Sequence, residues 1–208
     1  NSVIFLKKST FPKEAREITP DVKSAIADGA LLAQGDILAI SVESVQGQKY
    51  MIASFHGDTN GLATKPVTDA VVRVAKNLKD HKLIFGLDAN TYEHAKADQQ
   101  DVKDYETSFR NQGLLSCWGK TVNPANYTTF NARTFLQPQL NKACRKDEKR
   151  QGGDVNPKDF ILFWEKDFTV QTTWKDNTGQ KTYTENMAFP TLDFPSDHGI
   201  LVTVLDSK

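Results

Sequence analysis

The sequence predicts a four-layered α/β (α+β) sandwich, in which two packed mixed β-sheets are flanked by helices. Strand-like and helical segments alternate in the first half of the chain, whereas the second half is rich in strands. A near-continuous apolar run at residues 82–87 is typical of a strand inside a sheet. The chain has 208 residues, enough for a well-buried core, and we expect residues 1–208 to form one domain.

The first half is expected to contain four strands and one helix. Residues 37–45 and 50–55 are β-rich and flank a turn with Gly47, which predicts a hairpin. Residues 65–80 carry apolar side chains at spacings of three and four, with Pro66 near the start, which predicts an amphipathic helix. Shorter β-rich segments predict a strand at residues 3–7 and a strand at residues 82–87 that is buried on both faces.

The second half is expected to contain a helix followed by strands. Residues 102–112 place Tyr105 and Phe109 on one face, and Gly113 ends this helix. Residues 160–164 and 199–205 are predicted to be buried strands, and residues 168–174 a half-exposed one. Between them, residues 141–158 are highly charged and are interpreted as an exposed loop of net positive charge, with its basic residues at 145–150.

Composition excludes several classes of protein. Lys plus Arg equals Asp plus Glu, at 26 each, which argues modestly against non-specific binding of long nucleic acid. No apolar stretch is long enough to cross a membrane. Cys117 and Cys144 could form one disulfide in a secreted protein, but two free thiols are favoured. The sequon at Asn126 slightly favours a secreted or lumenal protein, and the first residues do not resemble a signal peptide.

Four polar clusters lie where predicted strands meet solvent. They are residues 55–61 after one strand, 87–90 after the next, 158–159 before a third and 196–199 before the last. Each one alone is more typical of a turn than of a catalytic site. The first cluster contains Gly57 and Gly61 but lacks the spacing of a P-loop.

In their order, the four clusters resemble the endonuclease/exonuclease/phosphatase superfamily, whose fold is that of deoxyribonuclease I. The matching residues are His56 at a strand end, Asp88-Ala89-Asn90, Asp159 at the start of a strand, and Ser196-Asp197-His198 near the C-terminus. Residues 127–130 (YTTF) resemble the threonine-containing segment that precedes the Asp strand in many members.

The resemblance implies a role for each matching residue. His198 would act as general base or hold the scissile phosphate, with Asp159 orienting its imidazole. Asp88, Asn90 and Asp197 would hold Mg²⁺ or Mn²⁺, with Asp88 and Asn90 also orienting the nucleophile. His56 would donate to a phosphate oxygen. Further phosphate contacts are expected from Asn60 and Thr129.

Two signature positions of the superfamily have no match: an N-terminal Asn and the Glu of a Gln-Glu segment that binds the metal. Glu14, Glu17 and Glu43 lie in the wrong context. We therefore expect the domain to be N-terminally incomplete. The missing part would be a cleaved segment of the same precursor, or a partner chain would cover its place.

The function expected from the resemblance is a divalent-metal-dependent phosphoesterase that hydrolyses a phosphodiester or phosphomonoester, as a nuclease or phosphatase does. Nucleic acid, lipid and nucleotide substrates all remain open. The alternative is a non-catalytic binding or structural component that retains the fold.

Overall fold

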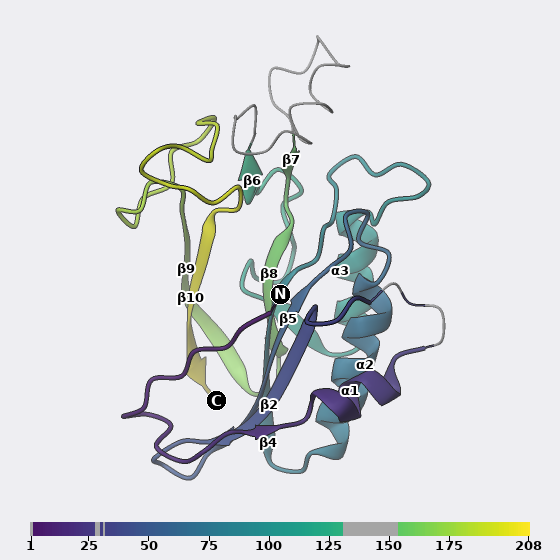
Figure 1. Cartoon of the computed structure of the whole chain (residues 1–208), viewed down its shortest axis with the longest axis vertical. Helices are drawn as coiled ribbons and strands as arrows, with labels where there is room; N and C mark the ends of the chain where they lie inside the picture. Colours follow the sequence, from purple (N-terminus) through teal and green to yellow (C-terminus); the bar gives the residue numbers. More distant parts are fainter. Residues whose placement is uncertain (1, 28–29, 31, 131–153) are drawn as a thin grey trace.

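The computed structural model describes residues 2–27, 30, 32–130 and 154–208. Its centre is a six-stranded mixed sheet in the order β1-β2-β3-β4-β8-β5 (Figure 1). β3 and β4 are parallel, and every other neighbouring pair is antiparallel. The strands are β1 (Arg16–Glu17), β2 (Ile37–Glu43), β3 (Lys49–His56), β4 (His81–Asp88), β5 (Leu114–Ser116) and β8 (Asp159–Trp164).

The predicted hairpin and the first predicted helix are confirmed. β2 pairs over its full length with residues 49–55 of β3, and Gly47 adopts a positive φ of 80° in the turn between them. Parallel strands need a crossover connection, and α2 (Thr64–Asn77) connects β3 to β4. This helix ends before residue 80 because Leu78 takes an extended conformation.

Three helices cover one face of the sheet. They are α1 (Thr19–Ala25), α2 and α3 (Val102–Asn111). α3 starts at Asp101, whose carboxylate accepts hydrogen bonds from two backbone N–H groups of the first turn. The strand side chains beneath the helices are fully or almost fully buried: Met51, Ala53, Phe55, Leu83, Phe85, Leu87, Phe160, Leu162 and Trp164. Because strand side chains alternate, the residues between these point to the opposite face.

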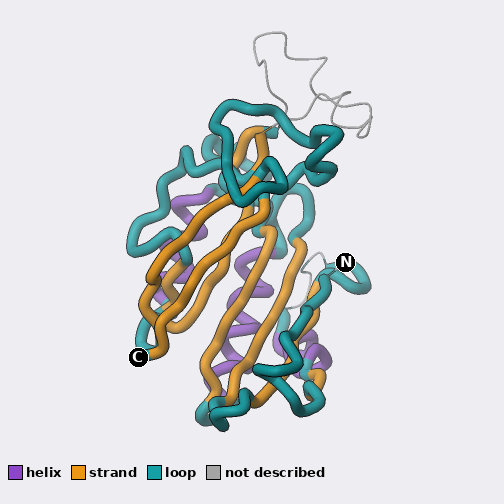
Figure 2. Tube along the Cα trace, turned by 90° about the vertical axis from the view of Figure 1, so that its left-hand side faces the viewer, coloured by secondary structure: helices purple, strands orange, loops and turns teal. Residues whose placement is uncertain are grey.

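The opposite face carries a smaller antiparallel sheet of β9 (Phe168–Asp176) and β10 (Ile200–Ser207). A second apolar cluster of Leu115, Phe163 and Phe168 joins the two sheets. A short ribbon of β6 (Thr129–Phe130) and β7 (Val155–Asn156) lies near one end of the large sheet, and the long connecting loops gather at that end (Figure 2). The predicted α/β sandwich is confirmed.

Three strand predictions are corrected. Residues 3–7 form no strand, because they have no pairing partner among the described residues; Val3 and Phe5 are 58% and 90% exposed. β4 is buried on one face only, since the small sheet covers the other face incompletely and leaves Ile84 half-buried. β10 is not buried: it lies at the edge of a two-stranded sheet, where Ile200 and Val204 are exposed.

The remaining expectations concern the two cysteines, the charged loop and the absence of a membrane span. Cys117 is buried, whereas Cys144 lies outside the described residues, as do the basic residues expected at 145–150. None of the helices described has both the length and the apolar character that a membrane span requires.

Candidate active site

Three of the predicted site residues lie in one row across the large sheet. His56 ends β3 and is the register partner of Asp88, which ends β4. Asp88 is in turn the partner of Asp159, which begins β8. All three alternate with residues that are buried under the helices, so they point to the same, opposite face. Pairing of strands distant in sequence therefore brings two carboxylates and an imidazole together.

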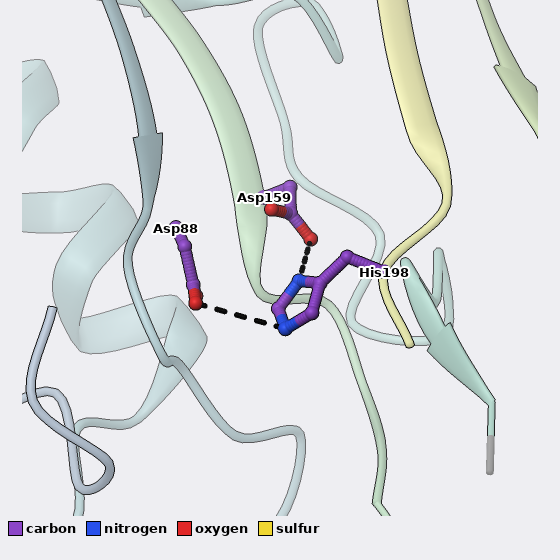
Figure 3. A group of neighbouring side chains, drawn as sticks. All are labelled: Asp88, Asp159 and His198. Carbon is purple, nitrogen blue, oxygen red and sulfur yellow. Dashed lines mark hydrogen bonds and ion pairs between the residues drawn. The ribbon is translucent and has the colours of Figure 1, made fainter. Parts of the chain in front are cut away.

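His198 joins this row from the loop that precedes β10. Its Nδ1 atom lies 2.8 Å from Oδ2 of Asp159, and its Nε2 atom lies 3.7 Å from Oδ2 of Asp88, so the imidazole stands between the two carboxylates (Figure 3). An ionised carboxylate only accepts hydrogen bonds, so Nδ1 donates to Asp159. His56 is more exposed, and its Nε2 atom lies 3.4 Å from the same Asp88 oxygen.

The glycine-containing loop after β3 packs against the turn that carries Asn90. Gly61 has a φ of +72°, and a Cβ atom there would lie 2.7 Å from the carbonyl oxygen of Asn90 and 2.8 Å from that of Ala89. Thr64 donates its hydroxyl to the same Ala89 oxygen at 2.7 Å. Asp58 closes the loop by accepting from the N–H of Ala63. The first and second polar clusters of the sequence thus form one packed unit.

Thr128 ties the start of β8 to the loop of His198. Its buried hydroxyl accepts from the N–H groups of Lys158 and Asp159, at 2.9 and 3.0 Å. Its carbonyl oxygen accepts from the N–H of Gly199 at 2.7 Å. One residue therefore helps to place both members of the Asp159–His198 pair.

Asn90 holds both oxygens of Asp88. Its backbone N–H donates to Oδ1 at 2.9 Å, and its side-chain Nδ2 donates to Oδ2 at 3.2 Å and to the carbonyl oxygen of Gly57 at 3.0 Å. The turn needs a φ of +46° at Asn90, a region that Asn tolerates better than most residues. The amide oxygen of Asn90 accepts from Nζ of Lys158 at 2.8 Å.

The electrostatics of the cluster follow from its burial. Burial and the neighbouring charge of Asp159 raise the pKa of Asp88 to about 7, against the opposing effects of His198, Asn90 and Lys158. Burial lowers the pKa of His198, but Asp159, Asp88 and Asp197 outweigh it and raise that pKa to about 9. The site therefore holds an excess of negative charge around one imidazole.

The donor set fits a divalent cation. Among the described residues, Asp88, Asp159 and His198 form a group whose ligand atoms lie within 4.8 Å of one another. Carboxylate oxygens are the ligands that Mg²⁺ and Mn²⁺ prefer. A cation would also relieve the repulsion between the two carboxylates. Asp197 is outside this group, although its charge acts on His198.

The remaining predicted residues lie nearby with varied exposure. Asn60 is half-buried in the loop after β3. Thr129 is almost fully buried, and its hydroxyl donates to the carbonyl oxygen of Asn156 at 3.3 Å. Sequence reasoning missed Lys158 and the buried hydroxyl of Thr128 as parts of the site. A lysine immediately before the Asp of an apolar strand was the available signal, but lysines at strand ends are usually solvated.

The comparisons with known proteins identify the fold. No family model matches the chain, and no curated protein matches its sequence. The structure resembles the catalytic domain of human Nocturnin with a bound sulfate anion (TM-score 0.55, 14% identity, 94% of this chain and 59% of that chain). It also resembles an endonuclease/exonuclease/phosphatase from Bacteroides vulgatus (0.52, 14%, 87% and 61%) and D. rerio TDP2 with a single-strand DNA product (0.50, 14%, 95% and 68%).

The chain thus spans about three-fifths of the length of the first two of these structures. The similarity in three dimensions agrees with the fold expected from the sequence. The chain therefore has the fold of the endonuclease/exonuclease/phosphatase superfamily.

Proposed function

We propose that the protein is a divalent-metal-dependent phosphoesterase that hydrolyses a phosphodiester or a phosphomonoester. The observation that carries this proposal is the position of the His198 imidazole between two partly buried carboxylates, with Nδ1 bonded to Asp159 and Nε2 facing Asp88. A carboxylate that fixes the tautomer leaves Nε2 as the reactive nitrogen, which is the arrangement that acid–base catalysis requires.

The residues of the row would have different roles in hydrolysis. A divalent cation, when bound at Asp88, would supply Lewis-acid stabilisation of the phosphoryl oxygens and offset the charge of Asp88. With that charge offset, the pKa of His198 would be lower, and Nε2 would be better able to accept a proton from water. Asp159 holds the imidazole during that transfer. Without the offset, His198 stays protonated near neutral pH and is suited to holding a phosphate oxygen.

Residues at the rim would bind the phosphate. His56 has a side chain that is 55% exposed and close to Asp88, so it can donate to a phosphate oxygen that approaches the row. Asn60 and Asp197 lie at the same end of the sheet, and we propose a phosphate contact for the first and support of the cation for the second. Thr129 would reach a phosphate only by giving up its bond to Asn156.

We also propose that the acidic metal ligand of the superfamily's Gln-Glu segment comes from polypeptide outside this chain, either an upstream piece of the precursor or a covering partner. The support is apolar surface that the described residues leave incompletely covered: Ile52 and Ile84 on the sheet face are only half-buried, and Val204 on the edge strand is 41% exposed. Native and denaturing mass spectrometry of natural-source protein tests this idea. An active sample whose single chain has the mass of residues 1–208 alone under both conditions would contradict it.

The phosphoesterase proposal is tested with bis(p-nitrophenyl) phosphate and p-nitrophenyl phosphate, in Mg²⁺, Mn²⁺ or chelator. Metal-dependent turnover is expected, with at least a hundredfold loss in Asp88→Ala and His198→Ala. His94→Ala is the matched control, because this histidine is 79% exposed and lies outside the row. The absence of turnover by folded natural-source protein on both substrates would favour the non-catalytic alternative.

A further inference from the structure

Lys158 is a buried cation at the entrance of β8. Its side chain is only 4% exposed, although lysine is rarely buried unless its charge is paired. Its ammonium group forms an ion pair with Asp154, donates to Oδ1 of Asn90 at 2.8 Å, and lies 5.1 Å from the centre of the Tyr92 ring. The ammonium is therefore held charged inside the protein.

The chemistry of Lys158 determines the orientation of the Asn90 amide. An ammonium group has three donors and no acceptor, so the Asn90 atom that faces it has to be the oxygen. The NH₂ group then points the other way, toward the carbonyl oxygen of Gly57 and Oδ2 of Asp88. A flipped amide would set NH₂ against the ammonium and oxygen against two acceptors. All three side-chain hydrogen bonds of Asn90 would be lost.

The orientation matters because Asn90 is almost fully buried and directly contacts Asp88. With NH₂ toward Asp88, both carboxylate oxygens receive a hydrogen bond from the same residue, one from the backbone and one from the side chain. The carboxylate is thereby fixed in rotation and held toward His198 and Asp159. The Lys158 ammonium bonds to Asp154 and Asn90 and acts on Asp88 through its charge, so the orienting part of its influence on the row passes through Asn90.

We propose that Lys158 is a positioning residue of the site: its donor-only ammonium fixes the Asn90 amide, and Asn90 in turn fixes both oxygens of Asp88. The catalytic meaning of this relay rests on the proposed phosphoesterase function. The relay itself is a property of the metal-free chain and is measured without turnover.

Two substitutions distinguish orientation of the Asn90 amide by Lys158 from a purely structural role of its buried charge. Lys158→Arg keeps a side chain that only donates, whereas Lys158→Gln introduces an amide that donates and accepts, and so no longer requires the oxygen of Asn90 on its side. The control is Lys175→Gln. The side chain of Lys175 is 9% exposed, pairs with Glu185, donates to the carbonyl oxygen of Tyr127 at 2.8 Å and lies 3.8 Å from the Tyr183 ring centre, and none of these partners belongs to the row.

The first measurement is hydrogen exchange of the Asn90 side-chain NH₂ by NMR in chelator. Exchange is expected to be at least about tenfold faster in Lys158→Gln than in wild type, because Oδ1 of Asn90 is no longer fixed by a donor-only group and the amide opens more often. Lys158→Arg and Lys175→Gln are expected to remain within about threefold of wild type. The second measurement is Mn²⁺ affinity by calorimetry, which is expected to fall about 10–100-fold in Lys158→Gln, with kcat falling more than KM rises.

The outcomes are distinct. Unchanged NH₂ exchange in folded Lys158→Gln overturns the relay, whatever the activity. Faster exchange with no Mn²⁺ binding or turnover in wild type supports the relay and rejects the phosphoesterase proposal. If Lys158→Gln does not fold, Lys158→Arg decides: NH₂ exchange as fast as in an unstructured amide would overturn the relay, and protected NH₂ with Mn²⁺ affinity close to wild type would support it.

Discussion

Removing the negative charge of Asp159 tests the geometry of the row that this carboxylate forms with Asp88 and His198. Asp159→Asn keeps the size of the side chain but replaces the carboxylate that accepts from Nδ1 of His198 at 2.8 Å. Asp159 is the largest of the causes that raise the pKa of His198 from 6.5 to about 9. Without it, burial is opposed only by Asp88 and Asp197. We therefore expect the pKa of His198 to fall by about 2 units in Asp159→Asn, which corresponds to ~3 kcal/mol.

NMR titration of the imidazole in the presence of chelator measures this shift. The chain has four histidines, so a His198→Gln variant assigns the resonance. Asp197→Asn is the matched control, since Asp197 is the smallest of the raising causes and makes no hydrogen bond to the ring. A pKa of His198 that moves by less than about half a unit in Asp159→Asn would refute the arrangement. So would an equal shift in both variants.

The same shift predicts how stability depends on pH. A histidine whose pKa is higher in the folded protein stabilises the fold below its ordinary pKa, and this contribution is lost as the pH rises through the folded value. The His198 contribution is therefore complete below pH 6.5 and lost toward about pH 9. Urea unfolding without metal gives the free energy of unfolding of the wild type and of Asp159→Asn. The wild-type value minus the variant value is expected to fall by about 2–3 kcal/mol between pH 6 and 9.5. A difference that is flat over this range would contradict the assignment.

Three further predictions concern the supports of the row. Gly61→Ala is expected to lower the unfolding free energy in urea by about 2–4 kcal/mol. The control Gly47→Ala is expected to cost less, because Gly47 shares the positive φ but has open space around it. Equal costs would refute the close contact. Thr128→Val leaves two buried N–H groups without their acceptor and is expected to cost about 2–4 kcal/mol, against less than ~1 for the exposed Thr107→Val. Asp88→Asn is expected to stabilise the metal-free protein at pH 8 by about 1–3 kcal/mol, because a buried carboxylate is removed, and to abolish the rise in Tm produced by Mn²⁺; a persisting rise would place the cation elsewhere.

The elements with strong local patterns were predictable from sequence. α2 and α3 follow from their apolar spacing, and the β2–β3 hairpin from two β-rich segments around Gly47. No helix was predicted at α1, which has only seven residues, and no strand at the short segments β1, β5, β6 and β7. Residues 3–7 alternate like a strand, but a strand exists only where another backbone pairs with it. Burial of β4 and β10 likewise depends on what covers each face.

The sequence by itself determined the residue types of the site and their order along the chain, because each cluster follows or precedes an apolar run that has to be a strand. Only the tertiary structure decided the register that aligns His56, Asp88 and Asp159, since pairing across the sheet joins segments up to about a hundred residues apart. It also decided the role of Lys158. A lysine beside a strand is usually solvated, and only packing against Asp154, Asn90 and Tyr92 makes this one a buried donor.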